Sequence, residues 1–481
     1  MWPARGASVP SGGSGRGDSA GVGSGDRVDA ARRRSQAAAR RAHRAVARSS
    51  PRRGGARPGR ALRACEPRRP APGPGPWPLP ATRGAKVSGP LEGYRVVEFA
   101  EAVAGPYCAM ELGDGGADVI KVEGLDGDRT RQWGSDDRGD VGAVFESLNR
   151  SKRGIALDLG GEPARELTAR LLRWADVAVI DAGRHEETIL AGGSSADTAP
   201  GLIACVISEF GDRGPWAGRA PYGELAAQVA GEATASLGRL GEEPVRVGTD
   251  IASMYAAIYA VQAICAALLE RERSGLGQRI DVSLFGSVLA MRSTLWVAMS
   301  NPDSWSGYHL GSYAQPPDYG HQCKDGAILF SLARITPEAR ESLIGDLEME
   351  WVKDDPRYGD FLQDRGGPTS DVAEIMQPVW ERAFSKFTMD EVIERVRRNG
   401  GWAFPTNNYQ QLVDLDQARH VGLVQTVDGP GGTPIQTLLP PWDFSETPVE
   451  LERPAPTLGQ HTREILADLG YGTREVTTLL D

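Results

Sequence analysis

Residues 247–284 read VGTDIASMYAAIYAVQAICAALLERERSGLGQRIDVSL, and the fold prediction starts from them. Neither Gly nor Pro occurs from 252 to 269, and alanines and bulky apolar residues occupy nearly every face, which predicts a helix buried on most sides. Gly275 then offers a left-handed stop. Apolar and polar residues alternate from 280 to 284, as in a half-buried strand. The stretch therefore predicts a helix inside a domain, a turn and a strand.

The polar residues at the start of this helix mark the place where chemistry is expected. They are residues 248–253, GTDIAS, and they include Asp250 and Ser253. A helix N-terminus offers unpaired N–H groups and the positive end of the helix dipole to an anion. Asp250 and Ser253 are therefore candidate site residues beside a potential anion site.

The first 86 residues differ in composition from the rest. They hold 19 Lys and Arg against 4 Asp and Glu, which leaves 35 basic and 60 acidic residues in the remainder. The segment is rich in Arg, Pro and Gly, and it has few bulky apolar residues that could offset the entropy of ordering. We expect it to be a disordered basic extension. A nucleic-acid tail, a transit peptide and a translation start near Val87 are alternative interpretations.

The cysteines and the charge of the body bear on location and partners. The five cysteines form no C-x-x-C pair and no metal-ligand spacing with the six histidines, a pattern typical of reduced intracellular proteins. No segment approaches the roughly 20 uninterrupted apolar residues of a membrane span. The acidic body disfavours nucleic acid. We expect a soluble, cytoplasmic protein with no metal and with neither nucleic acid nor membrane as a partner.

Residues 94–123 show a strand–helix–strand pattern. A strand is predicted over 94–100, a helix through Leu112 that stops at Gly115 and Gly116, and a second strand over 118–123. About 30 residues is the length of a parallel βαβ unit. The glycines follow the helix instead of preceding it, which argues against a dinucleotide-binding fingerprint. A strand over 155–159, an amphipathic helix over 163–174 and a strand over 176–180 continue the pattern.

The expected fold class is α/β, with a Rossmann-like large domain around a parallel sheet. Beyond Phe285 the pattern changes to loops rich in Trp, Tyr and Pro, followed by a strand over 327–332 and three helical segments, the third opened by a capping box from Thr388 to Glu391. We therefore expect the large domain over 87–312, a small α+β domain over 313–405, and a C-terminal segment over 406–481 that returns to the large domain.

Several short motifs occur in order along residues 90–480. They are AGPYC at 104–108, GADVIKVE at 116–123, NRSKR at 149–153, SEFG at 208–211, Ile251-Ala252, AAL at 266–268, GQ at 277–278, IDVS at 280–283 and RPAPTLGQHTRE at 453–464. Together they resemble the family III CoA-transferases, which include the carnitine and formyl-CoA:oxalate CoA-transferases and alpha-methylacyl-CoA racemase. The resemblance implies coenzyme A as acyl-CoA substrate, carboxylic acids as the other substrates, and an interlocked dimer closed by the C-terminal tail.

The resemblance also implies a set of CoA-binding residues. They are Val103, Ala104, Asn149, Lys152, Arg153, Arg184 and Tyr222. Lys152 and Arg153 would hold the CoA phosphates through charge-assisted hydrogen bonds, whereas a charge run with no such resemblance is more often a solvated turn. Tyr222 stands where the racemase has its proton-abstracting histidine, so the racemase branch is the less expected one.

The catalytic position is where the chain departs from the family. Family members use an aspartate that carries CoA as a thioester, and this chain has Ser253 at that position, with Asp250 about one helical turn upstream. A serine has no acyl carbon of its own on which CoA can be held. Three interpretations follow: a CoA-transferase with Asp250 as nucleophile, a noncatalytic CoA-binding subunit that pairs with an aspartate-bearing homologue, and an acyl-CoA racemase or isomerase. As the alternative to catalysis, Asp250 is an N-cap.

Overall fold

The computed structural model describes most of the chain beyond residue 88. The described residues are 89–134, 142–158, 162–183, 186, 189–190, 199–217, 250–291, 320–332, 335–363, 371–429, 434–449, 451 and 453–480. The chain divides into two units, Met1–Thr82 and Arg83–Asp481, and all described residues belong to the second. The prediction of disorder for residues 1–86 and the predicted site residues Arg184 and Tyr222 lie outside the described residues.

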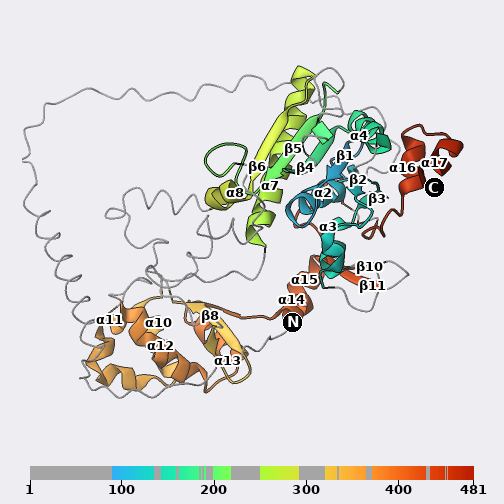
Figure 1. Ribbon diagram of the computed structural model, residues 1–481. Coiled ribbons are helices and arrows are strands. Elements are labelled where there is room, and N and C mark those ends of the chain that lie inside the picture. Colours follow the sequence, from blue (N-terminus) through green and yellow to red (C-terminus); the bar gives the residue numbers. More distant parts are fainter. Residues whose placement is uncertain are drawn as a thin grey trace, which may run out of the picture. The chain divides into compact units, whose positions relative to one another are not determined.

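A six-stranded parallel sheet forms the centre of the large body (Figure 1). Its strands follow the order β3-β2-β1-β4-β5-β6, with β1 Arg95–Phe99, β2 Asp118–Glu123, β3 Lys152–Ala156, β4 Val177–Asp181, β5 Ile203–Ser208 and β6 Arg279–Ser283. The chain winds outward through β2 and β3 and then restarts at β4 on the other side of β1. The predicted α/β class and parallel sheet are thereby confirmed. One boundary was wrong, because the strand expected from Ile155 begins at Lys152.

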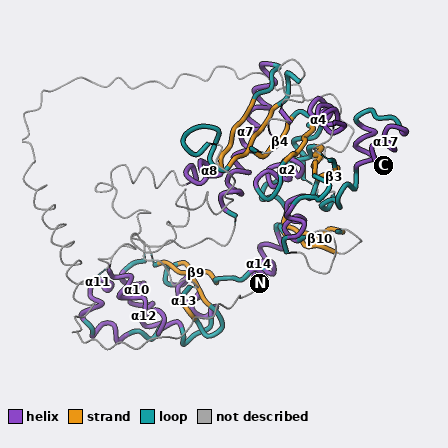
Figure 2. Tube along the Cα trace, in the orientation of Figure 1, coloured by secondary structure: helices purple, strands orange, loops and turns teal. Residues whose placement is uncertain are grey.

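Helices cover both faces of this sheet (Figure 2). On one face lie α2 Ala104–Asp114, α7 Ile251–Ser274 and α8 Leu284–Met291; on the other lie α4 Glu162–Trp174, α16 Thr462–Asp468 and α17 Thr473–Leu480. Neighbouring residues of β1, Val96 and Val97, contribute to different cores, one on each face. The inner strands β1, β4 and β5 are buried on both sides, which explains why they are mostly apolar without alternation, whereas the edge strand β6 alternates and is partly exposed.

Helix α7 is the crossover between β5 and β6, as the opening stretch predicts. It ends at Gly275, whose φ of 73° is left-handed. A row of alanines, among them Ala256 and Ala260, packs against α2 in the same core. The prediction that α7 is buried on most sides is wrong, since its other face is exposed at Cys265 and at Leu269. Contrary to expectation, α7 is also long and apolar enough to span a membrane, but its place between two strands of one sheet makes it a core helix.

A second sheet belongs to a smaller body with its own hydrophobic core. Its antiparallel strands are β7 His321–Gln322, β8 Ala327–Ser331 and β9 Trp402–Pro405. Its helices are α10 Pro337–Asp346, η2 Glu350–Asp354, η3 Pro356–Tyr358, α11 Gly359–Leu362, α12 Asp371–Phe384 and α13 Met389–Arg398. The predicted capping box of Thr388 and Glu391 opens α13. The smaller α+β body is thus confirmed, while its predicted boundaries stay a prediction.

The C-terminal part of the chain contacts the large sheet. It contains α14 Tyr409–Asp414, α15 Asp416–His420 and the hairpin of β10 Val424–Asp428 and β11 Pro434–Leu438. Further on, the N–H of Gly154 in β3 donates to His461 Nδ1 (3.0 Å), and the N–H of His461 donates to the Gly154 carbonyl (2.9 Å). His461 directly precedes α16. These two bonds seat the tail against the edge strand β3.

Candidate active site

The carboxyl ends of the parallel strands carry the candidate site. Helix α2 begins directly after β1, and α7 starts at the same edge because it runs back across the sheet to reach β6. The two helices pack side by side in one core. The structure therefore brings the predicted residues Val103 and Ala104 to the same edge as Asp250 and Ser253. Open α/β sheets bind ligands outside the carboxyl ends of their strands, where the strand order reverses, which here is between β1 and β4.

Asp250 sits at the N-cap position of α7 without acting as a cap. Its φ and ψ are −79° and 60°, and its side chain makes no capping hydrogen bond. Its carbonyl accepts the N–H of Met254 at 3.0 Å, so only the backbone takes part in the helix start. The side chain is half-buried, and it makes no hydrogen bond or ion pair within the described part of the chain. The carboxylate thus lies at a helix N-terminus, and no described side chain binds it.

Ser253 lies one turn further into α7 and is much less accessible. Its exposed fraction is 6%, and it belongs to the helix face on which Ala252 and Ala256 are also buried. Residues three apart on a helix have Cβ atoms about 5 to 6 Å apart. The two candidate catalytic residues therefore share one helix start, but Asp250 is half-exposed and Ser253 is packed against the core.

Lys152, a predicted phosphate ligand, is buried with all of its donors in use. An ammonium group has three N–H donors. Lys152 Nζ donates to Glu98 Oε2, to Asn149 Oδ1 and to the Pro106 carbonyl, each at 2.8 Å, and the side chain is completely buried. Asn149, also predicted to contact CoA, is fully buried in the same set of bonds. A phosphate on Lys152 would have to displace these partners, so the assignment stays a prediction without a free donor to support it.

Arg153, the second predicted phosphate ligand, pairs with three carboxylates of the chain itself. Its Nε and Nη2 donate to Asp118 at 3.0 and 2.7 Å. Its Nη1 donates to Glu464 at 2.9 Å and to Asp468 at 2.6 Å. Arg153 thereby joins β2 and β3 to α16. A role for it in phosphate binding stays a prediction and would require exchange of these ion pairs.

A buried charge network beneath the start of α2 was not found by the sequence reasoning. Glu98 accepts from Lys121 at 2.9 Å and from Lys152 at 2.8 Å, and all three side chains are completely buried. Asp128 lies 3.0 Å from Lys121. Burial lowers the pKa of Lys152 to about 8, against the attraction of Glu98. For Lys121 the nearby carboxylates outweigh burial and raise the pKa. A charged residue inside an otherwise apolar strand, such as Glu98 or Lys121, is the signal that marks such a network.

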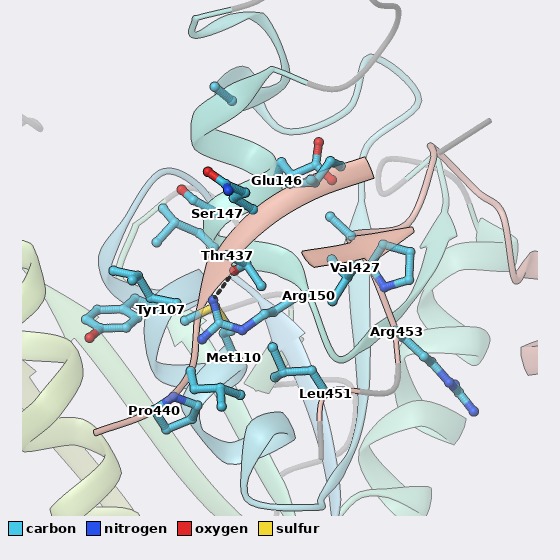
Figure 3. Close-up of a pocket in the computed structure, with 18 of the residues that line it drawn as sticks. Tyr107, Met110, Glu146, Ser147, Arg150, Val427, Thr437, Pro440, Leu451 and Arg453 are labelled. Atoms are coloured by element: carbon cyan, nitrogen blue, oxygen red, sulfur yellow. Dashed lines mark hydrogen bonds between the residues drawn. The ribbon is translucent and has the colours of Figure 1, made fainter. Parts of the chain in front are cut away.

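A cavity of about 980 Å³ lies beside α2 and reaches the start of α7 (Figure 3). Its walls come from α2, α3 Ala143–Asn149, the hairpin and the segment after it, and Met254 of α7 also lines it. Arg150 spans it, with Nη2 on Asp114 (2.6 Å) and Nη1 on Thr437 Oγ1 (3.2 Å). Burial raises the pKa of Glu111 in this wall. The cavity offers apolar space with a few charged groups; it meets α7 at Met254, and neither Asp250 nor Ser253 lines it.

Comparison with known proteins gives this geometry a context. The family model for CoA-transferase family III matches residues 91–462. The chain is 30% identical to the succinate–glutarate CoA-transferase of Agrobacterium fabrum, over 81% of this chain and 98% of that one. It is 30% identical to the beta subunit of the succinyl-CoA–L-malate CoA-transferase of Chloroflexus aurantiacus, over 80% and 95%. A crystal structure of a CAIB/BAIF family protein from Brucella suis superposes with a TM-score of 0.66 at 29% identity, over 79% of this chain and all of that one.

Proposed function

Since the chain belongs to CoA-transferase family III, we propose that it moves CoA from succinyl-CoA or a similar thioester to a second dicarboxylic acid, with Asp250 as nucleophile. Transfer of CoA between carboxylic acids is the activity of its relatives, and the chain is a CoA-transferase of this kind. One relative is named for succinate with glutarate and another for succinyl-CoA with malate. Succinate, glutarate and malate are dicarboxylates, and succinyl-CoA is the CoA thioester of one. These names support the narrower substrate class.

The observation that carries the proposal is the carboxylate of Asp250, which lies at the start of α7 and makes no capping hydrogen bond there. Its oxygen attacks the thioester carbonyl of the donor, which releases CoA thiolate and leaves a mixed anhydride. The thiolate then attacks the Asp250 carbonyl of the anhydride, the donor acid leaves, and Asp250 holds CoA as a thioester. The acceptor acid takes CoA by the same two steps in reverse. The α7 N–H groups and dipole stabilise the negative charge that develops at each carbonyl.

The test is transfer from succinyl-CoA to a panel of acids, with glutarate and malate beside acetate and benzoate. Asp250→Asn should abolish transfer, because an amide cannot form the thioester, and Ser253→Ala should keep most of it. Mass spectrometry of protein incubated with succinyl-CoA should find CoA attached at Asp250. Full turnover of Asp250→Asn in a purified homomer would show that the nucleophile is assigned wrongly.

A second candidate function is that of a noncatalytic CoA-binding subunit. It is favoured by the buried Ser253 at the position of the family's aspartate and by the relative that is named a beta subunit. In this case the isolated chain binds CoA and transfers none, and Ser253→Asp gains transfer because it restores a carboxylate at the helix start. Transfer by the isolated natural chain would exclude this function.

We also propose that the protein is an obligate dimer, either of two copies or with a homologue. The outward face of α7 exposes Leu269 to 58%, and the segment that leads to the hairpin exposes Leu412 to 50% and Tyr409 to 83%. Exposed apolar side chains are expected at a protein interface, and these three support the proposal. Light scattering should find a dimer at every concentration at which the chain is folded, and a folded monomer on dilution would contradict the proposal.

A further inference from the structure

The turn from β1 into α2 is held in a strained conformation by two carboxylates. Ala102 has a φ of 65°, in the left-handed region that a residue with a Cβ seldom adopts. The N–H of Glu101, just before it, donates to Asp181 Oδ2 at 2.8 Å. The N–H of Ala102 itself points to Asp128 Oδ1 at 3.4 Å. Such strain persists where the surroundings fix it, and it is concentrated at functional sites.

Asp181 contacts this turn from β4, on the other side of the place where the strand order reverses. It is the last residue of β4, which pairs with β1, so its side chain leaves the sheet beside the turn. A Cβ placed on Gly105, in the first turn of α2, would lie 3.4 Å from Asp181 Oδ1 and 2.2 Å from Ala100 Cβ. The two oxygens of Asp181 therefore face both ends of the turn, one at the N–H of Glu101 and the other at the start of α2.

We propose that Asp181 is a positioning residue for CoA binding: its carboxylate fixes the β1–α2 turn and with it the start of α2, where Val103 and Ala104 are the predicted CoA contacts. The inference rests on the proposed function, since it names a residue that serves the same site. Asp181 touches neither substrate nor nucleophile in this role. It acts through the N–H of Glu101.

Burial of Asp181, together with the charges around it, makes this hydrogen bond to the turn sensitive to pH near neutrality. The groups that face it are Glu98 on β1, Glu101 in the turn and Lys121 on β2. Burial raises the pKa of Asp181 to about 7, against the bond from Glu101 and the attraction of Lys121. An ionised carboxylate accepts a hydrogen bond about twice as strongly as a neutral group. The turn is therefore held firmly above pH 7, and the hold weakens as the pH falls below it.

A carboxylate at the other end of β4 offers a matched control. Asp176 Oδ2 accepts the N–H of Arg95, at the amino end of β1, at 2.9 Å. This bond joins the same two strands, β1 and β4, at the edge away from the starts of α2 and α7, where Asp176 Oδ1 also accepts from Arg271 Nη1 in the last turn of α7 at 3.2 Å. Asp176→Asn and Asp181→Asn therefore make the same chemical change between the same strands, and only the second removes a charge from the carboxyl edge.

The test is calorimetric titration of the full chain with dephospho-CoA at pH 6, 7 and 8. This ligand lacks the phosphate monoester, which would itself titrate near pH 6. The natural chain and Asp176→Asn should lose affinity as the pH falls. Asp181→Asn should bind about tenfold more weakly at pH 8, the loss of one charge-assisted bond, and should show no such pH dependence.

The outcomes separate this inference from the proposed function. A natural chain that does not bind the ligand overturns both. A natural chain that binds, beside an Asp181→Asn variant with the same affinity and the same pH profile, overturns the role of Asp181 alone. If Asp181→Asn fails to fold, the natural chain decides: an affinity that stays flat from pH 8 to pH 6 overturns the inference, and a fall with its midpoint near pH 7 supports it.

Discussion

Replacing Lys152 with methionine separates a structural lysine from a phosphate ligand. Methionine keeps an unbranched apolar stem of similar length and removes the ammonium group. Glu98 then keeps Lys121 as its one cationic partner, while Asn149 and the Pro106 carbonyl each lose a donor. All of these groups are buried, on β1, β2, α2 and the end of α3, so water cannot easily replace the lost bonds.

The expected loss of stability follows from the burial of the Lys152–Glu98 ion pair. Breaking a buried ion pair by removal of one partner costs about 3 to 5 kcal/mol, because a charge is left uncompensated. A typical folding free energy is about 5 to 15 kcal/mol, so the loss is a large fraction of the whole. For a large domain each kcal/mol shifts the melting temperature by roughly 2 to 4 °C, and a drop of about 6 to 20 °C is therefore expected. A phosphate ligand would instead cost about 1.5 to 3 kcal/mol of CoA affinity.

The assay is thermal melting at one fixed scan rate, with CoA titration of the same samples. Lys386→Met is the control, because Lys386 pairs with Glu348 at 3.0 Å on the surface, where both side chains are at least 36% exposed. An exposed pair of this kind is worth about 0 to 1 kcal/mol, so the control should melt near the natural chain. A Lys152→Met protein that melts with the control and binds CoA at least tenfold more weakly would refute the structural role and restore the phosphate assignment.

Three further predictions concern other parts of the chain. Gly105→Ala places a Cβ 2.2 Å from Ala100 Cβ, so the start of α2 must shift. CoA titration should then show a loss of affinity of at least about tenfold. An unchanged affinity would contradict the role of the α2 start in CoA binding. Burial lowers the pKa of His321, so the unfolded chain takes up a proton first and the free energy of unfolding falls as the pH drops below about 6.5. His321→Phe should therefore reduce the change in melting temperature between about pH 5 and pH 7.5. A melting temperature that depends on pH as strongly as that of the natural chain would count against this. Deletion of residues 1–86 should leave the melting temperature and oligomeric state unchanged, and a clear drop in melting would show that the segment docks.

The parallel sheet could be predicted because its strands are short and apolar and alternate with helical segments. The strand at 118–123 was predicted with the bounds that the structure has, since Gly116 and Gly124 flank a segment in which Val119, Ile120 and Val122 favour a strand. The start of β3 was missed because Lys152 and Arg153 have the composition of a turn. From sequence alone a charged residue is expected to be exposed, because burial requires partners that the sequence does not show. The partners of Lys152 and Arg153 come from β1, β2 and α16.

The candidate site could be predicted only where one element carries it. Asp250 and Ser253 precede and open a single long helix, so their place at a helix start followed from the sequence. Asp181 and Glu98 were missed because their roles depend on strand order: Asp181 meets the turn after β1 only because β4 lies next to β1. The exposure of one face of α7 could not be predicted for a related reason. A helix that is apolar on every side carries no sign of which face is covered.

The packing of α7 gives the two principal interpretations opposite expectations for the same substitution. Position 253 is packed against the core, whereas position 250, three residues earlier and just before the helix, is half-exposed. If Asp250 is the nucleophile, the thioester carbonyl must bind about one helical turn further out than an aspartate at 253 would require. Ser253→Asp then adds a like charge beside the working carboxylate and should slow transfer. If the chain is a noncatalytic subunit, no working carboxylate is present, and the same substitution should create transfer. The sign of the change therefore decides between the two functions.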